Sequence, residues 1–298
     1  MTDFHPGTTP DKDPHPQSAT ADFNVFEQPK IDCHCHIFDP EHFPYTTDTA
    51  YRPSGGEIST ADYFSHVLAA YGVQHALLVQ PNSGYGSDNR CMLDAIHRGK
   101  GTFKGIAIAS HDTSDSELAD LKAQGIVGIA HNVAMLGEAY YAQYDALWKR
   151  LAKAGMFVQV QVAGDQMARL APRLKSCEAQ ILVDHHGRPD ISAGISAPGF
   201  QALLDLAKTA RCYVKLSGYD KFSEQAFPFS DAEPFTQALF EAFGPDHCLW
   251  ASDWPHLRAV RRLDYGVLAR LLQKVIPDDQ ARARIFYETP KRIFGFEK

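Results

Sequence analysis

The chain has 298 residues, of which 44% are hydrophobic and 22% are charged, and this balance is typical of a soluble globular protein with a large core. No apolar run approaches the roughly 18 residues that span a bilayer, so we expect no integral membrane protein. The formal net charge of −7 argues against a nucleic-acid-binding protein, which would usually carry a basic stripe. An anionic substrate is compatible with this charge where arginines are concentrated locally.

The beginning of the chain differs in composition from the rest. The first 28 residues are rich in proline, aspartate, threonine and histidine and show no hydrophobic periodicity. We expect a flexible arm over residues 1–28 and one folded domain over residues 29–298. The start also lacks the basic residues and the apolar stretch of a secretory signal peptide. The scattered cysteines show no paired zinc-ribbon spacing, so we expect free thiols and a cytoplasmic protein.

From residue 30 onward, short apolar or alternating runs recur between helix-like segments. Eight runs predict strands, at residues 30–38, 75–81, 104–110, 126–132, 156–162, 180–187, 211–218 and 247–253. The segments between and after them predict helices, at residues 59–71, 88–99, 114–123, 141–154, 165–175, 197–209, 233–243 and 264–276. Ser59, Asp88, Ser114 and Asp165 are expected to cap four of these helices.

Strand and helix alternating eight times is the pattern of a closed parallel (β/α)8 barrel, the TIM barrel. An open doubly wound sheet would need a glycine-rich phosphate turn after the first strand, which the sequence lacks. Residues 278–293 predict an extra C-terminal helix, which we expect to lie across the outside or the bottom of the barrel.

The first predicted strand ends in the segment IDCHCHIFDP, residues 31–40. Period-2 alternation places His34 and His36 on one face of the strand and Cys33 and Cys35 on the other. Taken alone, a histidine at the end of a strand is more often a hydrogen-bonded structural residue than a catalyst. Closure of a barrel changes this interpretation, because it brings Asp253, at the end of the eighth strand, beside both histidines.

Other polar side chains lie at or near the ends of the predicted strands, where the active site of this fold is found. Those that we expect to contact a substrate from these positions are Ser83, His131, Gln159 and Lys215.

Three segments resemble the signatures of the amidohydrolase superfamily. They are DCHCHIFDP at the first strand, DHHGRPD at the sixth and ASDWPH at the eighth. In this order they are similar to the branch that contains 2-pyrone-4,6-dicarboxylate lactonase, sulfomuconolactone hydrolase and galactarolactone isomerase. The resemblance covers residues 30 to about 293 and implies a barrel hydrolase that acts on a lactone or a related carboxylic ester.

The resemblance also implies roles for individual residues. His34, His36, His185 and Asp253 would form the central polar cluster, and Arg188 and His256 would hold a substrate carboxylate or developing charge. The chain departs from the family pattern at the fourth strand, where a relative that binds a dicarboxylate typically has GxRFN and this chain has GIAHN. Ala130 replaces the arginine, which argues against an exact match to the pyrone dicarboxylate substrate.

Lactone hydrolysis needs a base, a group that polarises the carbonyl and a donor for the leaving oxygen. Asp253 is the candidate base, and we expect burial in the barrel mouth to raise its pKa. The three histidines would stabilise the oxyanion either as hydrogen-bond donors or, together with Asp253, as ligands of one divalent ion, for which zinc or manganese suits the ligand types.

The family pattern favours the first of these two roles. Binuclear members bridge two metals with a lysine or carboxylate on strand four, where this chain has His131. Mononuclear members usually add a histidine on the strand after the one that carries His185, and this chain has Lys215 there. We therefore expect a site that requires no metal, with one divalent cation, Zn²⁺ or Mn²⁺, as the alternative.

The hypothesis from the sequence is a lactonase that adds water to a small anionic lactone in aromatic or sugar-acid catabolism. A mononuclear zinc-dependent decarboxylase or hydratase of the same superfamily is the alternative enzyme. A non-catalytic binding protein for an organic anion is the alternative from another class. The sequence leaves the oligomeric state open.

Overall fold

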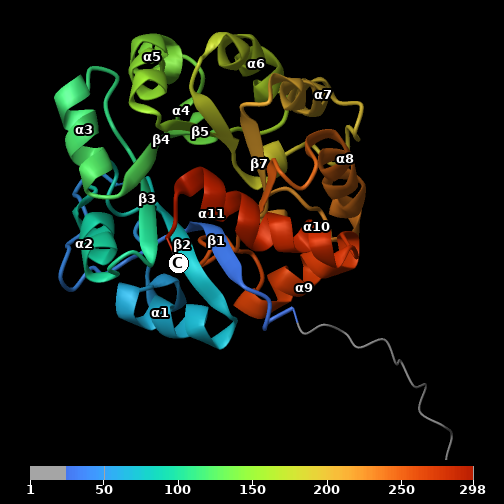
Figure 1. The fold of residues 1–298 in the computed structure, drawn as a ribbon, viewed down its shortest axis with the longest axis horizontal. Coiled ribbons are helices and arrows are strands. Elements are labelled where there is room, and N and C mark those ends of the chain that lie inside the picture. Colours follow the sequence, from blue (N-terminus) through green and yellow to red (C-terminus); the bar gives the residue numbers. More distant parts are fainter. Residues whose placement is uncertain (1–24, 50, 298) are drawn as a thin grey trace, which may run out of the picture.

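Eight parallel strands form the centre of the molecule, and helices surround them (Figure 1). The computed structural model describes residues 25–49 and 51–297. The predicted (β/α)8 barrel is confirmed, since neighbouring strands pair in parallel and in chain order. The strands are β1 Lys30–Cys35, β2 Val73–Val79, β3 Phe103–Ala107, β4 Ile126–Asn132, β5 Phe157–Gln161, β6 Gln180–Val183, β7 Cys212–Leu216 and β8 Cys248–Trp250.

The helices between the strands follow the predicted order, with shifts at their ends. The longer ones are α1 Ala61–Ala70, α2 Arg90–Arg98, α3 Asp115–Ala123, α5 Asp145–Ala154, α6 Gln166–Ser176, α7 Pro198–Leu206, α8 Glu233–Phe243 and α9 Tyr265–Val275. The shorter ones are α4 Val133–Leu136, α10 Asp279–Ala283 and α11 Thr289–Phe294. In the described part of the chain, no helix has the length and apolar character to cross a membrane.

Two helix starts show how local sequence and tertiary contacts compete. The Ser114 side chain accepts from the Glu117 N–H, and the Glu117 carboxylate accepts from the Ser114 N–H, so the predicted cap is confirmed as a capping box. The caps predicted at Ser59 and Asp88 are each wrong by one residue, because Thr60 and Asn89 are the N-caps of α1 and α2. Asp165 is the N-cap of α6, but its side chain forms no capping hydrogen bond. The Ser59 hydroxyl instead accepts a hydrogen bond from Trp254 Nε1.

The core has two layers. Side chains such as Leu77, Ile106, Leu182 and Leu249 fill the inside of the barrel. A larger cluster packs the outer side of the strands against the helices. Full burial of one such side chain contributes roughly 1.5–3 kcal/mol, so both layers stabilise the ring of strands.

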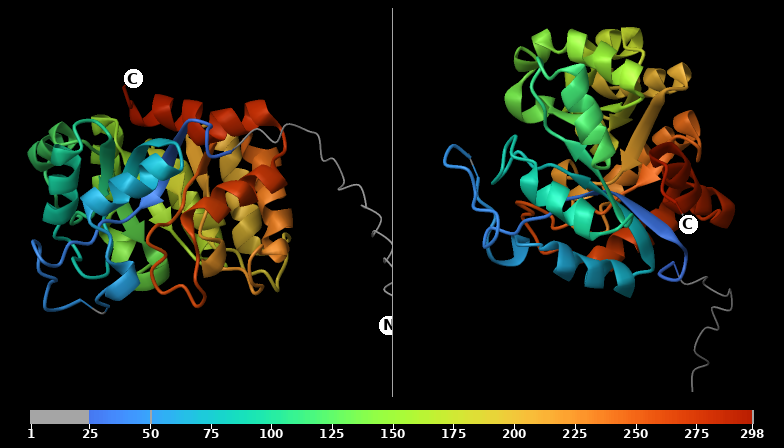
Figure 2. Two further views of the ribbon diagram at one scale, coloured as in Figure 1. Left: turned by 90° about the horizontal axis from the view of Figure 1, so that it is seen from below. Right: turned by 60° about the vertical axis from the view of Figure 1, so that its left-hand side comes forward.

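The C-terminal segment closes the amino end of the barrel. Helix α11 lies across the barrel in Figure 1, and in the left view of Figure 2 the red C-terminal helices are at the opposite end from the blue loop that follows β1. Phe294 and Phe296 join the inner apolar cluster, and the Phe294 ring meets the Phe157 ring at a centroid distance of 5.4 Å. The predicted terminal helix is therefore at the bottom, although a π-helical turn at Arg284–Glu288 divides it.

The ring closes between β8 and β1 near the carboxyl ends of these strands. The Asp253 N–H donates to the His34 carbonyl at 2.9 Å, and the His36 N–H donates to the Trp254 carbonyl at 2.8 Å. Deeper in the seam the buried Asp32 carboxylate accepts from the Ser252 N–H at 3.0 Å. The Asp32 side chain thus supplies a hydrogen bond where the backbone ladder between β8 and β1 is missing. The closure predicted to bring Asp253 beside His34 is confirmed.

One detail of the first strand differs from the prediction. Cys33 packs with the inner cluster, whereas Cys35 packs with the outer one, so the two thiols do not share a face. The reason is a register shift between Asp32 and Cys35 in the pairing of β1 with β2, which interrupts strict alternation. All six cysteines are free and buried, as expected of a protein without disulfides.

The predicted arm, residues 1–28, lies outside the described residues up to position 24. Its last residues are packed against the barrel: Val25 is buried, and the carbonyls of Val25 and Gln28 each accept from Lys30 Nζ at 2.6 Å.

Candidate functional site

A cavity of about 490 Å³ opens at the carboxyl ends of the strands, where the barrel prediction places an active site. Most of the predicted site residues line it: His34, His36, Ser83, His131, Gln159, His185, Arg188 and Asp253. Lys215 and His256 are not in its lining.

The floor of the cavity brings three imidazoles to one carboxylate. Asp253 Oδ1 lies 3.8 Å from His34 Nε2, 3.6 Å from His36 Nε2 and 3.8 Å from His185 Nε2. All four side chains are nearly enclosed by protein. Strands β1, β6 and β8 therefore supply the cluster that the motifs predicted.

Backbone hydrogen-bond acceptors and carboxylates orient the imidazoles. The Val79 carbonyl accepts from His36 Nδ1 at 2.8 Å. His34 Nδ1 lies 3.2 Å from Asp184 Oδ1 and 3.2 Å from Lys215 Nζ. His185 Nδ1 lies 3.0 Å from Ser217 Oγ. When Nδ1 of a neutral ring carries the hydrogen, Nε2 carries a lone pair. His36, whose Nδ1 faces only a carbonyl acceptor, thus points the lone pair of Nε2 at the Asp253 carboxylate.

The loops after β6 and β8 contain the strained backbone of the site. His185, Arg188, Asp253 and His256 have φ values of 53°, 44°, 60° and 64°, in the left-handed region that residues other than glycine seldom adopt. Each such residue costs on the order of 1–2 kcal/mol. Sharp turns at these positions direct the side chains inward immediately after their strands, and the surrounding packing must offset the strain.

The protonation of Asp253 differs from the expectation. Burial by itself raises the pKa of this carboxyl, but the neighbouring His185 and Lys221 lower it more, so its pKa lies well below the usual range. Lys221, which the sequence did not single out, has its Nζ 3.5 Å from Asp253 Oδ2. The predicted rise in pKa is wrong, and Asp253 is ionised at neutral pH.

Comparison with known proteins agrees with the cluster. A family model described as amidohydrolase matches residues 31–296. The chain belongs to the amidohydrolase family. It is 31% identical over 301 residues to a 4-sulfomuconolactone hydrolase of Rhizobium radiobacter, with 97% of each chain covered. It is 27% identical over 283 residues to a 2-pyrone-4,6-dicarboxylate hydrolase of Comamonas testosteroni, with 90% of each chain covered.

A solved structure extends the similarity to three dimensions. A probable 2-pyrone-4,6-dicarboxylic acid hydrolase of Acinetobacter baumannii, with citric acid bound, matches with a TM-score of 0.81 at 27% identity. The match covers 90% of this chain and 99% of that chain. The branch of the superfamily expected from the three motifs is thus confirmed.

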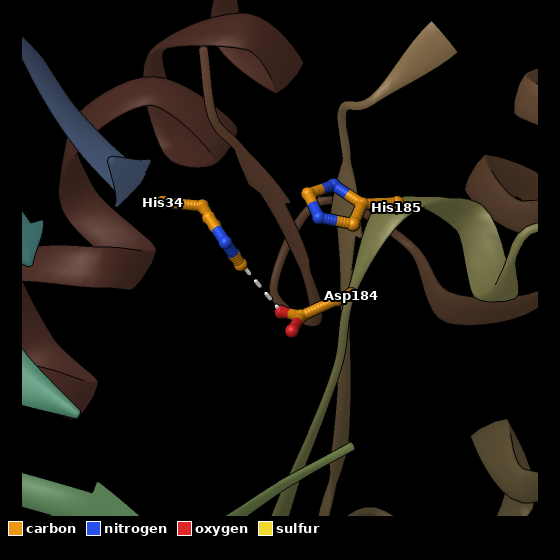
Figure 3. A group of neighbouring side chains, drawn as sticks. All are labelled: His34, Asp184 and His185. Carbon is orange, nitrogen blue, oxygen red and sulfur yellow. Dashed lines mark hydrogen bonds and ion pairs between the residues drawn. The ribbon is translucent and has the colours of Figure 1, made fainter. Parts of the chain in front are cut away.

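In this amidohydrolase, Lys215 lies beneath the cavity rather than in it. Its Nζ is 2.9 Å from Asp184 Oδ1 and 2.7 Å from Gln159 Oε1, and its side chain is fully buried. Gln159 in turn donates to Asp184 Oδ2 at 2.9 Å. Figure 3 shows Asp184 directed at His34, with His185 beside it. Because Lys215 is fully buried and does not line the cavity, the structure does not place it in contact with a substrate as predicted.

Asp184 is the residue of this network that sequence reasoning did not assign to the site. Burial raises the pKa of its carboxyl, but Lys215 and His34 lower it more, so the net shift is downward and Asp184 is ionised. Its position directly before His185 at the end of β6 was the available signal.

Two further residues that were predicted to contact a substrate, His131 and His256, lie away from the floor of the cavity. His131 faces outward, where its Nδ1 is 3.1 Å from the Ile129 carbonyl and its Nε2 accepts from Trp148 Nε1 at 3.1 Å. With both nitrogens engaged, His131 has a structural role, although it reaches the edge of the cavity. The buried His256 lies against the Trp254 ring, and neither of its nitrogens has a hydrogen-bond partner in the described chain.

The donors of this amidohydrolase cluster fit one cation. Two overlapping groups of potential ligands are present, His34 with His36 and Asp253, and His34 with Asp184 and His185. The His36 lone pair faces the anionic Asp253 oxygen at 3.6 Å, which is too far for a hydrogen bond, and a cation between the two atoms would stabilise this arrangement. Second nitrogens tied to carbonyl and carboxylate acceptors are also typical of metal-binding histidines.

Proposed function

We propose that this amidohydrolase opens a small anionic lactone by addition of water. The observation that carries the proposal is the ionised Asp253 carboxylate among three imidazoles at the floor of a cavity that Arg188 also lines. The lactone hydrolases among its relatives support the same reaction class. In aromatic or sugar-acid catabolism such a step converts a cyclic ester into an open hydroxy acid or keto acid.

The chain's own residues account for the movement of the proton. Water attacks the carbonyl carbon while Asp253 accepts one of its protons. The ring carbon–oxygen bond then breaks, and the leaving oxygen takes the proton back from Asp253. Since the Asp253 carboxyl has a lowered pKa, it is a weak base but returns the proton readily. Arg188 supplies positive charge for a substrate anion at the edge of the cavity.

We also propose that one divalent cation occupies the cluster, held by Nε2 of His34, His36 and His185 together with Asp253. Such an ion, when bound, polarises a carbonyl and lowers the pKa of water. The tautomer of His36 supports this alternative over the expected metal-free site, because a neutral ring with its hydrogen on Nδ1 cannot donate from Nε2. The free buried cysteines are consistent with a cytoplasmic enzyme.

Two measurements test these proposals. Purified protein is incubated in ¹⁸O-labelled water with carboxylated pyrones, muconolactones and aldarolactones, and label in one open-chain acid is the expected result. Failure to open any of them overturns the function. Elemental analysis should find about one zinc or manganese per chain, and a chelator should lower the unfolding temperature as well as the activity. Full activity with no bound metal overturns the cation.

The cation-compatible donor set also favours a second candidate, a mononuclear zinc decarboxylase or hydratase. Release of CO₂ from an aromatic carboxylic acid, without ring opening of any lactone, would replace the first proposal with this one.

A further inference from the structure

The two sides of the cavity differ in charge. One side, which we call the cationic wall, is formed by Arg188, Lys221 and Arg258 from the loops after β6, β7 and β8. The other side, the amide wall, is formed by Asn82 and Ser83 from the loop after β2, Ala130 and Asn132 from β4, and Gln161 from β5. The catalytic cluster lies between the two walls.

Within the cationic wall, the two arginines are available to a ligand. Lys221 is already paired, since its Nζ is 2.9 Å from Asp220 Oδ2 and donates to the Leu257 carbonyl at 2.7 Å. Arg188 is half-buried and, among the described residues, forms no ion pair, and its Nε is a buried donor without an acceptor. A buried donor of this kind is costly unless a ligand satisfies it.

Arg258 lies at the rim of the same wall. Its guanidinium carbon lies 4.5 Å from the centre of the Tyr51 ring, and its backbone N–H donates to Glu57 Oε1 at 2.8 Å. Stacking on an aromatic ring orients a guanidinium without neutralising it. As with Arg188, the described residues provide its side chain with no ion-pair partner.

The amide wall offers hydrogen bonds but no positive charge. Asn82 Oδ1 accepts from Asn132 Nδ2 at 3.2 Å, which fixes the two amides against each other. In the part of the chain that the structure describes, the side chains of Ser83 and Gln161 have no hydrogen-bond partners. Such groups match hydroxyl and carbonyl groups of a ligand, whereas a carboxylate on this side would lose hydration without gaining a cation.

We propose that the substrate is a lactone with a single anionic group, which Arg188 and Arg258 bind, and with uncharged hydroxyl or carbonyl groups against the amide wall. This inference rests on the proposed lactone hydrolysis and specifies the charge of its substrate. It excludes lactones with a second anion at the far end of the molecule as preferred substrates.

Two matched pairs of lactones test the proposal. Galactono-1,4-lactone and galactaro-1,4-lactone differ by one terminal carboxylate, and 2-pyrone-6-carboxylate and 2-pyrone-4,6-dicarboxylate differ by a second one. Both kcat/KM and calorimetric Kd are measured for the complete protein. We expect the first carboxylate to improve binding at least about tenfold and the second to weaken it by a similar factor. Preference for the dicarboxylate, or indifference to the first carboxylate, overturns the proposal.

The binding measurement separates this inference from the proposed function. Binding in the expected order without turnover contradicts hydrolysis but supports the charge preference. Turnover with the opposite order of binding supports hydrolysis but contradicts the charge preference. Absence of both binding and turnover for all four compounds overturns both.

Three variants assign the effect to the walls. Arg258→Gln should weaken binding of the galactaro-lactone about tenfold and leave the neutral galactono-lactone unchanged. Arg261→Gln, an exposed arginine of the same loop that does not line the cavity, is the matched control. Gln161→Lys adds a cation to the amide wall and should reverse the preference between the two pyrones. An unchanged order in Gln161→Lys contradicts the division into two walls.

Discussion

The two ends of the barrel are built from different residues and under different constraints. At the amino end, Phe294 and Phe296 pack on the inner apolar cluster, and Phe294 ends the regular α-helix α11. At the carboxyl end, charged side chains converge on Asp253, and the backbone after β6 and β8 enters the left-handed region. Apolar packing at one end offsets the strain and the buried charge at the other, so stability and chemistry are separable along the barrel axis.

The largest effect that this separation predicts is catalytic. Asp253→Asn removes the base, so kcat should fall by about 10³–10⁴ while thermal unfolding changes little. Steady-state kinetics and calorimetry check both parts. Asp190→Asn makes the same chemical change on the surface, in the loop after β6, and should leave kcat near its original value. An active Asp253→Asn enzyme would remove this residue from its role.

Lys215→Met tests the buried network that joins the two ends. The substitution leaves the Asp184 carboxylate buried without its cation, and we expect the free energy of unfolding to fall by about 4 kcal/mol. Chemical denaturation measures the loss. The double variant with Asp184→Asn should recover part of it, because the two residues interact directly. A variant of unchanged stability with only a raised KM would instead make Lys215 a substrate ligand.

Phe294→Ala isolates the amino end. Truncation of this buried ring should cost roughly 3–4 kcal/mol of unfolding free energy, because it leaves a cavity against Phe157. The kcat should stay the same, since the ring lies at the far end from the catalytic cluster. Val260→Ala, an exposed change near the mouth, is the stability control. A large loss of kcat in Phe294→Ala at a temperature where the variant is folded would show that the two ends are coupled.

The pH dependence of the free energy of unfolding tests one buried group of the outer layer, His131. Burial lowers the pKa of His131 from 6.5 to about 4, so the unfolded chain binds a proton at this residue before the folded chain does. Its contribution is complete above pH 6.5 and is lost as the pH falls toward 4, by about 3 kcal/mol. In His131→Gln, the denaturation midpoint should change less with pH across this range. The surface variant His97→Gln should keep the original pH dependence. An equal slope in both would contradict a neutral buried His131.

Much of the fold and the centre of the site could be predicted from the sequence. Eight apolar runs separated by helical segments specify the ring, and the ring determines that Asp253 returns to His34. Register within a strand was less predictable, as the different environments of Cys33 and Cys35 show, because a bulge depends on the neighbouring strand.

The residues around the centre were harder to assign because their roles depend on distances between strands. In the sequence, the segment around Lys215 has the same pattern as one that carries a substrate-binding lysine. Only the enclosure of Lys215 by Asp184 and Gln159 distinguishes the two cases. The pKa of Asp253 is likewise lowered by His185 and by Lys221, and Lys221 reaches it from another loop. No local signal marks such a contact.

The seam between β1 and β8 has a consequence for the assembly of the enzyme. His34 and His36 leave the ribosome first, and Asp253 is added near the end of synthesis. A truncated chain that lacks β8 and the residues after it has neither the Asp253 carboxylate nor the Ser252 donors to Asp32. The cluster of imidazoles and carboxylate is therefore complete only when the last strand docks against the first.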